Sequence, residues 1–109
     1  MNIAVLGTGM VGRTIAGRLQ ELGHTVTVGT RDPQATLARS EPDAMGTAPY
    51  AVWAAAHDGI GSATFAGAAA SAELIVNATS GAASLEVLSR AGNENLAGKV
   101  LVDIANPLD

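Results

Sequence analysis

Three glycines at a fixed spacing, at positions 7, 9 and 12, follow the first apolar run of the chain, Ile3–Leu6. Gly7 would let a strand turn sharply, Gly9 would let the main chain approach a diphosphate, and Gly12 would let a helix pack close to the strand. That helix would aim its unpaired N–H groups and the positive end of its dipole at the same place. The pattern therefore predicts a strand, a tight turn and a helix that together hold a nucleotide pyrophosphate.

The glycine spacing alone is a weak signal, because a chain with 13 glycines among 109 residues produces some clusters by accident. The alternative is an ordinary glycine-rich turn between a strand and a helix. The context strengthens the first interpretation, because Val11, Ile15, Leu19 and Leu22 follow at spacings that place them on one helical face.

Composition and length indicate one domain over residues 1–109. The chain is 48% hydrophobic and 15% charged, which is typical of a globular domain that buries one core. It holds one Trp, one Tyr and one Phe, so we expect a core made mainly of small aliphatic side chains.

Several function classes are disfavoured by what the sequence lacks. There are no cysteines, which removes disulfides and thiolate catalysis, and a net charge of −4 makes nucleic acid an unexpected partner. No apolar run is long enough for a membrane helix and no basic segment opens the chain, so we expect a cytoplasmic protein. His24 and His57 are expected on the surface, and no metal-binding cluster is visible.

Apolar runs and helical segments alternate along the whole chain. We expect strands at residues 2–6, 25–28, 63–65, 73–77 and 99–104, and helices at residues 10–22, 32–40, 50–56, 66–71 and 84–90. This alternation predicts an α/β fold of the Rossmann type, a doubly wound parallel sheet in the order 3-2-1-4-5. Residues 41–61 are expected to pack over the sheet edge, with a flap over the cofactor as the alternative.

The end of the fifth predicted strand lies close to Asp109. We therefore expect that the sheet lacks a sixth strand, that residues 1–109 are part of a longer chain, and that a homodimer or another element protects the exposed sheet edge.

The residues after the second predicted strand bear on which dinucleotide is bound. Asp32 lies about 20 residues beyond Gly12, where an acidic residue commonly binds the adenosine ribose of NAD. However, Thr30 and Arg31 occupy the strand tip, and Asp32 precedes Pro33 as a helix N-cap would. An arginine there can bind a 2′-phosphate, so the sequence predicts NADP(H) rather than NAD.

Polar residues follow the fourth and fifth predicted strands as well. Ligands of open parallel sheets bind outside the carboxyl ends of the strands, so we expect Asn77, Ala78 and Thr79 to face the cofactor, with Asn106 and Pro107 beside them. The alternative for the first group is a local turn or a helix cap. No pair of carboxylates and no Ser/His/Asp set converges, so the catalytic residues stay unknown.

The runs Ala4–Gly12, Gly29–Pro33, Val76–Thr79 and Asp103–Leu108 together resemble the amino-terminal domain of the NADP oxidoreductases that depend on coenzyme F420, a deazaflavin. The resemblance spans nearly all of the chain. It implies that Thr8, Gly9, Met10 and Val11 contact the pyrophosphate, that Thr30 and Arg31 contact the 2′-phosphate, and that Asn106 and Pro107 lie at the nicotinamide end.

The resemblance also implies an activity, hydride transfer between NADPH and the deazaflavin, with this domain alone binding only the dinucleotide. Three alternatives stay open. The domain could be a non-catalytic NADP(H)-binding or redox-sensing module, the cofactor domain of a ferric reductase or of an imine or hydroxy-acid dehydrogenase, or a structural remnant that binds nothing.

Overall fold

The computed structural model describes residues 1–34, 50–57, 59–79, 84–96 and 98–104. Its strands are β1 (Asn2–Leu6), β2 (Thr25–Thr30), β3 (Gly61–Thr64), β4 (Leu74–Asn77) and β5 (Val100–Asp103). Its helices are α1 (Met10–Glu21), α3 (Tyr50–Ala56), α4 (Phe65–Ser71), α5 (Ser84–Ala91) and α6 (Asn93–Leu96). All five predicted strands are present, although β3 begins two residues earlier than expected and Phe65, expected in this strand, begins α4. Helix α6 was not predicted. Pro33 and Gln34 begin the helix expected at residues 32–40, whose other residues lie outside the described ones.

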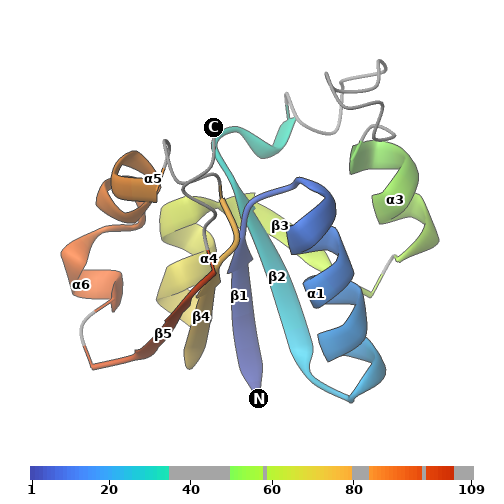
Figure 1. Ribbon diagram of the computed structural model, residues 1–109, viewed down its shortest axis with the longest axis horizontal. Helices are drawn as coiled ribbons and strands as arrows, with labels where there is room; N and C mark the ends of the chain where they lie inside the picture. The colour runs from blue at the N-terminus through green and yellow to red at the C-terminus, as the bar shows by residue number, and fades with distance from the viewer. Residues whose placement is uncertain (35–49, 58, 80–83, 97, 105–109) are drawn as a thin grey trace.

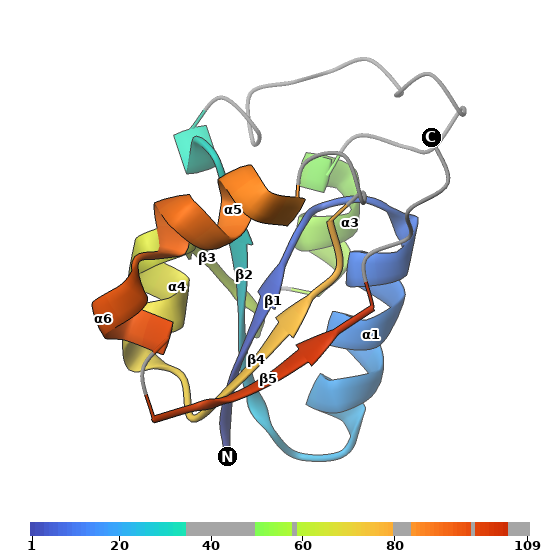
Figure 2. The same cartoon turned by 60° about the vertical axis from the view of Figure 1, so that its left-hand side comes forward.

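The sheet has the predicted parallel order, β3-β2-β1-β4-β5. Helices α1 and α3 cover one face of it, and α4, α5 and α6 lie on the other (Figures 1 and 2). All strands run the same way, so their carboxyl ends meet at one edge, the upper edge in Figure 1. This confirms the predicted Rossmann-type architecture.

Small side chains let α1 lie close to the sheet. Ala16 is fully buried with the apolar residues of β1 and β2, while Ile15 and Leu19 pack at the border of that cluster. Val11 and Leu22 share the apolar helical face expected from their spacing but are not buried, because 56% and 60% of their surfaces are exposed. The buried stripe of α1 is centred on Gly12 and Ala16, since only small residues fit where a helix approaches a strand closely.

Glycines end two helices as the sequence indicates, and a threonine that was expected within a strand begins a third. Gly23 adopts φ +96° after α1, and its N–H donates to the carbonyl of Gln20. Gly92 has φ +91° after α5, as expected for a residue that closes a helix. Thr64 caps α4, because its Oγ1 accepts from the N–H of Gly67 at 3.1 Å.

The described part of the 41–61 segment packs against the sheet. Tyr50 is 1% exposed and lies in the core cluster of β1 and β2, and Trp53 packs beside it. Helix α3 therefore lies on the sheet face that α1 also covers (Figure 1). Residues 41–49 lie outside the described ones.

Strand β5 forms one edge of the sheet and carries exposed apolar side chains on both faces. Val100 is 61% exposed, and Leu101, Val102 and Ile104 are each about 40% exposed. Lys99, just before β5, donates from Nζ to the carbonyls of Ala69 and Ala70 at the end of α4. None of the helices in the described part of the chain has the length and apolar character needed to cross a bilayer.

Candidate functional site

The glycine loop, residues 7–9, leaves β1 at the edge where the strands end. Gly7 has φ +122°, a conformation that side chains disfavour, and its N–H donates to the carbonyl of Gly29 in β2 at 2.9 Å. A Cβ at Gly7 would meet the carbonyl oxygen of Ala78 at 3.0 Å. Glycine is therefore favoured at position 7 for two reasons: its positive φ, and the small space left by the main chain of Ala78.

Gly12 and Gly9 differ in what surrounds them. A Cβ at Gly12 would lie 2.6 Å from the carbonyl oxygen of Gly7, so only glycine lets α1 approach the loop. A Cβ at Gly9 would meet nothing within 4 Å, because that residue faces open space at the start of α1. Gly9 is the N-cap and has no side chain to cap the helix, which leaves the first N–H groups of α1 directed at this space.

Arg13 braces the glycine loop from inside. Its Nε donates to the carbonyl of Thr8 at 2.6 Å, and its guanidinium lies 5.6 Å from the ring centre of Tyr50. Arg13 is only 7% exposed, and its bond to Thr8 supports the loop. The sequence reasoning missed it; the available signal is a basic residue close to the positive end of a helix, where the dipole disfavours a cation.

The turn after β4 lies against the glycine loop. Asn77 is fully buried, and its Oδ1 accepts from both the N–H of Thr79, at 3.3 Å, and the Oγ1 of Thr79, at 2.6 Å. The side chain of Asn77 thus builds a local turn, the alternative considered from the sequence. Ala78 lies beside Gly7 and Gly12, so the structure brings the two predicted groups together.

The end of β2 presents the residues predicted to choose the dinucleotide. Thr30 is 6% exposed, whereas Arg31 is exposed and its Nη2 lies 3.3 Å from Oε2 of Glu86 on α5. Asp32 accepts from the N–H of Gln34 at 3.1 Å, which confirms its expected role as a helix cap. Sequence reasoning missed Glu86, because no local pattern links residues 55 positions apart.

The other predicted site residues lie at the start of α1 or after β5. Asn106 and Pro107 lie outside the described residues, although Ile104 N–H donates to the carbonyl of Asn77 at 3.0 Å and so follows β5 to the same edge. Thr8 is half-buried, Val11 is exposed, and Met10 begins α1. Within the described part of the chain, no three His, Asp or Glu side chains are grouped so as to hold a metal ion.

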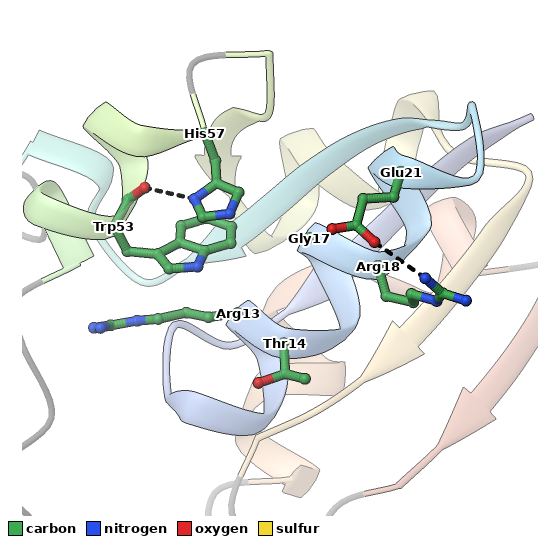
Figure 3. A pocket seen from close by; sticks show the side chains of 7 residues that line it. All are labelled: Arg13, Thr14, Gly17, Arg18, Glu21, Trp53 and His57. Atoms are coloured by element: carbon green, nitrogen blue, oxygen red, sulfur yellow. Dashed lines mark hydrogen bonds and ion pairs between the residues drawn. The ribbon is translucent and has the colours of Figure 1, made fainter.

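A separate hollow of about 270 Å³ lies between α1 and α3 (Figure 3). His57 stacks on Trp53 with ring centres 4.2 Å apart, and its Nδ1 is 2.9 Å from the carbonyl of Trp53. Arg18, across the hollow, is paired with Glu21 at 3.1 Å. The expectation that both histidines lie on the surface holds only in part, because His57 and His24 are half-buried.

A known protein family shares the segments at the carboxyl ends of the strands. The family model for NADP oxidoreductases that are coenzyme F420-dependent matches residues 2–107. The chain belongs to this family. The match includes the glycine loop, the end of β2 and the turn after β4.

Solved structures agree with this assignment. A protein of Arthrobacter sp. FB24, provisionally described as an F420-dependent NADP reductase, is 62% identical, with a TM-score of 0.93. The comparison covers 100% of this chain and 47% of that one, so this family member spans about half of the Arthrobacter protein. A diketoreductase at 23% identity and TM-score 0.67, covered 96% and 41% respectively, shares the fold. No curated protein matches significantly.

Proposed function

We propose that this domain binds NADP(H) across the carboxyl ends of β1, β2 and β4. The first N–H groups of α1 and the glycine loop receive the pyrophosphate, and Thr30 and Arg31 receive the 2′-phosphate. Asn77, Ala78 and Thr79, in the turn after β4, border the glycine loop on the side of β1 that faces away from β2. Asn106 and Pro107 border the nicotinamide end.

The observation that carries the proposal is the space at Gly9. The first turn of α1 contains no acidic residue and no side chain caps it, while a Cβ at Gly9 would meet open space. A pyrophosphate there accepts hydrogen bonds from free N–H groups at the positive end of the helix dipole. The residues present therefore fit a dinucleotide.

The exposed guanidinium at the end of β2 supports NADP(H) over NAD(H). Charge-assisted hydrogen bonds to a phosphate contribute about 1.5–3 kcal/mol, which corresponds to roughly one to two decades in affinity. Asp32, the residue that could have bound a ribose hydroxyl of NAD, is engaged in capping a helix.

The activity we propose is hydride transfer between NADPH and coenzyme F420. A bound nicotinamide would supply the hydride, and the residues of this chain would bind and orient it. The length of the Arthrobacter relative supports a division in which further chain covers the reactive face of the cofactor. The exposed apolar side chains of β5 support the prediction that this sheet edge is covered, by a second copy or by such chain.

Calorimetric titration with NADPH and NADH tests the binding proposal. Arg31→Ala should weaken NADPH binding by at least about tenfold and leave NADH binding nearly unchanged. Arg18→Ala is the matched control, since it removes another exposed, carboxylate-paired arginine far along α1. Equal losses for both cofactors in Arg31→Ala would contradict the proposed role.

A second measurement separates the proposed activity from the alternatives. The absorbance of F420 is followed after mixing with NADPH and the protein. Residues 1–109 alone are expected to bind NADPH without bleaching F420, so the assay uses a chain that also includes the part proposed to cover the reactive face. Binding of NADPH without bleaching of F420 by that longer chain would favour a non-catalytic or sensing module. Absence of binding to either cofactor would leave only a structural role.

A further inference from the structure

Arg31 is held by a carboxylate that also has a second partner. Oε2 of Glu86 lies 3.3 Å from Nη2 of Arg31, and Oε1 of the same carboxylate lies 3.0 Å from Nε of Arg90, one helical turn further along α5. All three side chains are about half exposed, at 56%, 47% and 50%. One carboxylate is thus shared between an arginine of the β2 end and an arginine of its own helix.

A carboxylate at this position opposes a phosphate for a simple electrostatic reason. A phosphate monoester carries a charge of about −1.5 to −2, and Arg31 carries one positive charge that Glu86 partly neutralises. Two anions that share one guanidinium repel each other. Binding of a 2′-phosphate to Arg31 is therefore expected to weaken its contact with Glu86.

Arg90 lowers the free energy needed for Arg31 to move from Glu86 to the 2′-phosphate. Because Arg90 is already bonded to the other carboxylate oxygen, Glu86 keeps a cationic partner after Arg31 turns away. The Glu86–Arg90 pair has the i, i+4 spacing that brings side chains together on one helix face. In Figure 2, α5 lies across the upper end of the sheet, near the end of β2, as this contact requires.

We infer that Glu86 is a specificity-determining residue that competes with the 2′-phosphate for Arg31, and that Arg90 sets the strength of this competition. Glu86 lowers the affinity for NADPH and leaves that for NADH unchanged, because NADH has no 2′-phosphate and does not require Arg31 to move. This inference rests on the proposed binding of NADP(H) at the β2 end.

Substitutions at the two partners should change NADPH affinity in opposite directions. Glu86→Gln should tighten NADPH binding about two- to fivefold, the range expected for an exposed ion pair. Arg90→Gln should weaken it about twofold, because Glu86 then has only Arg31 as a partner. The double variant should bind NADPH with the affinity of Glu86→Gln, because Arg90 acts only through its ion pair with the Glu86 carboxylate.

Matched controls come from an exposed ion pair on α1 that does not involve Glu86. Arg18 and Glu21 lie in the last turns of α1, and their side chains are 70% and 68% exposed. Glu21→Gln and Arg18→Gln change the net charge as the test variants do and should leave both affinities unchanged. The differences should shrink as salt is raised from about 0.02 to 0.5 M, because salt screens exposed charges.

The outcomes distinguish this inference from the proposed function. If the parent chain binds NADPH no better than NADH, the proposed function fails. If the parent chain discriminates and Arg31→Ala removes the preference, but Glu86→Gln leaves NADPH affinity unchanged, only the competition is overturned. Weaker NADH binding in Glu86→Gln would make Glu86 a ribose ligand. If Arg90→Gln lowers NADPH affinity equally in the parent chain and in Glu86→Gln, Arg90 is a phosphate ligand. This result, like weaker NADH binding in Glu86→Gln, overturns the inference.

Discussion

The loop at the end of β1 is shaped by main-chain atoms, whereas the end of β2 is shaped by charged side chains from two elements. At the first place, the carbonyls of Gly7 and Ala78 leave no room for additional carbon atoms. At the second, Arg31 and Glu86 meet in solvent across the gap between β2 and α5. Close contacts between main-chain atoms strongly restrict the conformation of the loop. An exposed ion pair contributes little energy and can rearrange easily.

This difference implies two kinds of response to substitution. Changes at the glycine loop should affect NADPH and NADH alike, because both cofactors carry the pyrophosphate. Changes at Arg31 and Glu86 should alter only the preference between them.

Gly12→Ala should lower the free energy of unfolding by about 3 kcal/mol and abolish binding of both cofactors. The added methyl group would lie 2.6 Å from a main-chain oxygen that cannot move without disturbing the turn. Urea unfolding and calorimetric titration measure the two effects.

Gly9→Ala provides the matched control for that variant. Its Cβ would occupy open space and its φ of −73° suits alanine, so stability should change by less than about 1 kcal/mol. Binding of both cofactors should nevertheless fall, because the methyl group occupies the approach to the pyrophosphate. Unchanged binding would move the cofactor site away from the start of α1.

Arg13→Ala should cost about 2 kcal/mol of stability, the usual contribution of a hydrogen bond made by a charged group. The carbonyl of Thr8 would lose its donor, so the affinities for NADPH and NADH should fall together. Thermal unfolding of Arg13→Ala beside Arg18→Ala isolates the effect, since Arg18 is exposed. A loss confined to NADPH would break the division between the two ends.

Tyr50→Phe should have the smallest effect on the free energy of unfolding, and this effect should depend on pH. The Tyr50 hydroxyl is buried and has no hydrogen-bond partner among the described residues, so its removal should be neutral or stabilising by up to about 1 kcal/mol. Burial raises the pKa of Tyr50 above its ordinary value of 10.0, and the nearby Arg13 opposes this.

The sign of the pH effect follows from that shift. Above pH 10.0 the unfolded chain loses the phenol proton more readily than the folded one, so the parent protein loses stability as pH rises. Tyr50→Phe should escape this loss, and its advantage in urea unfolding should grow from neutral pH to above 10.0. A constant difference would mean that Tyr50 titrates normally.

The same division explains how much could be predicted from the sequence. The turn at Gly7 and the cap at Asp32 follow from local spacing, because each depends on residues close together in the chain. The strand order joins distant segments, and it follows from the alternation of strands and helices, which is typical of one fold class. The partner of Arg31 lies 55 residues away, and only the packing of α5 brings it near. Sequence periodicity likewise overestimated the apolar face of α1, where small side chains decide the contact with the sheet.

Short-range patterns failed in two further places for related reasons. The four-residue helix α6 is too short to show a periodicity. The stack of His57 on Trp53 joins residues only four positions apart at the end of α3, and the spacing of two lone aromatic rings in a short segment did not single it out. The residues at the predicted nicotinamide end, Asn106 and Pro107, stay predictions.

The central position of β1 has a dynamic consequence. This strand is hydrogen-bonded on both sides and covered on both faces, so its amides should open to solvent only with the whole domain. The glycine loop grows directly out of it, while Arg31 and Glu86 can rearrange on the nanosecond timescale of exposed side chains. The proposed cofactor site therefore combines a loop held by a slowly opening strand with an ion pair that rearranges quickly.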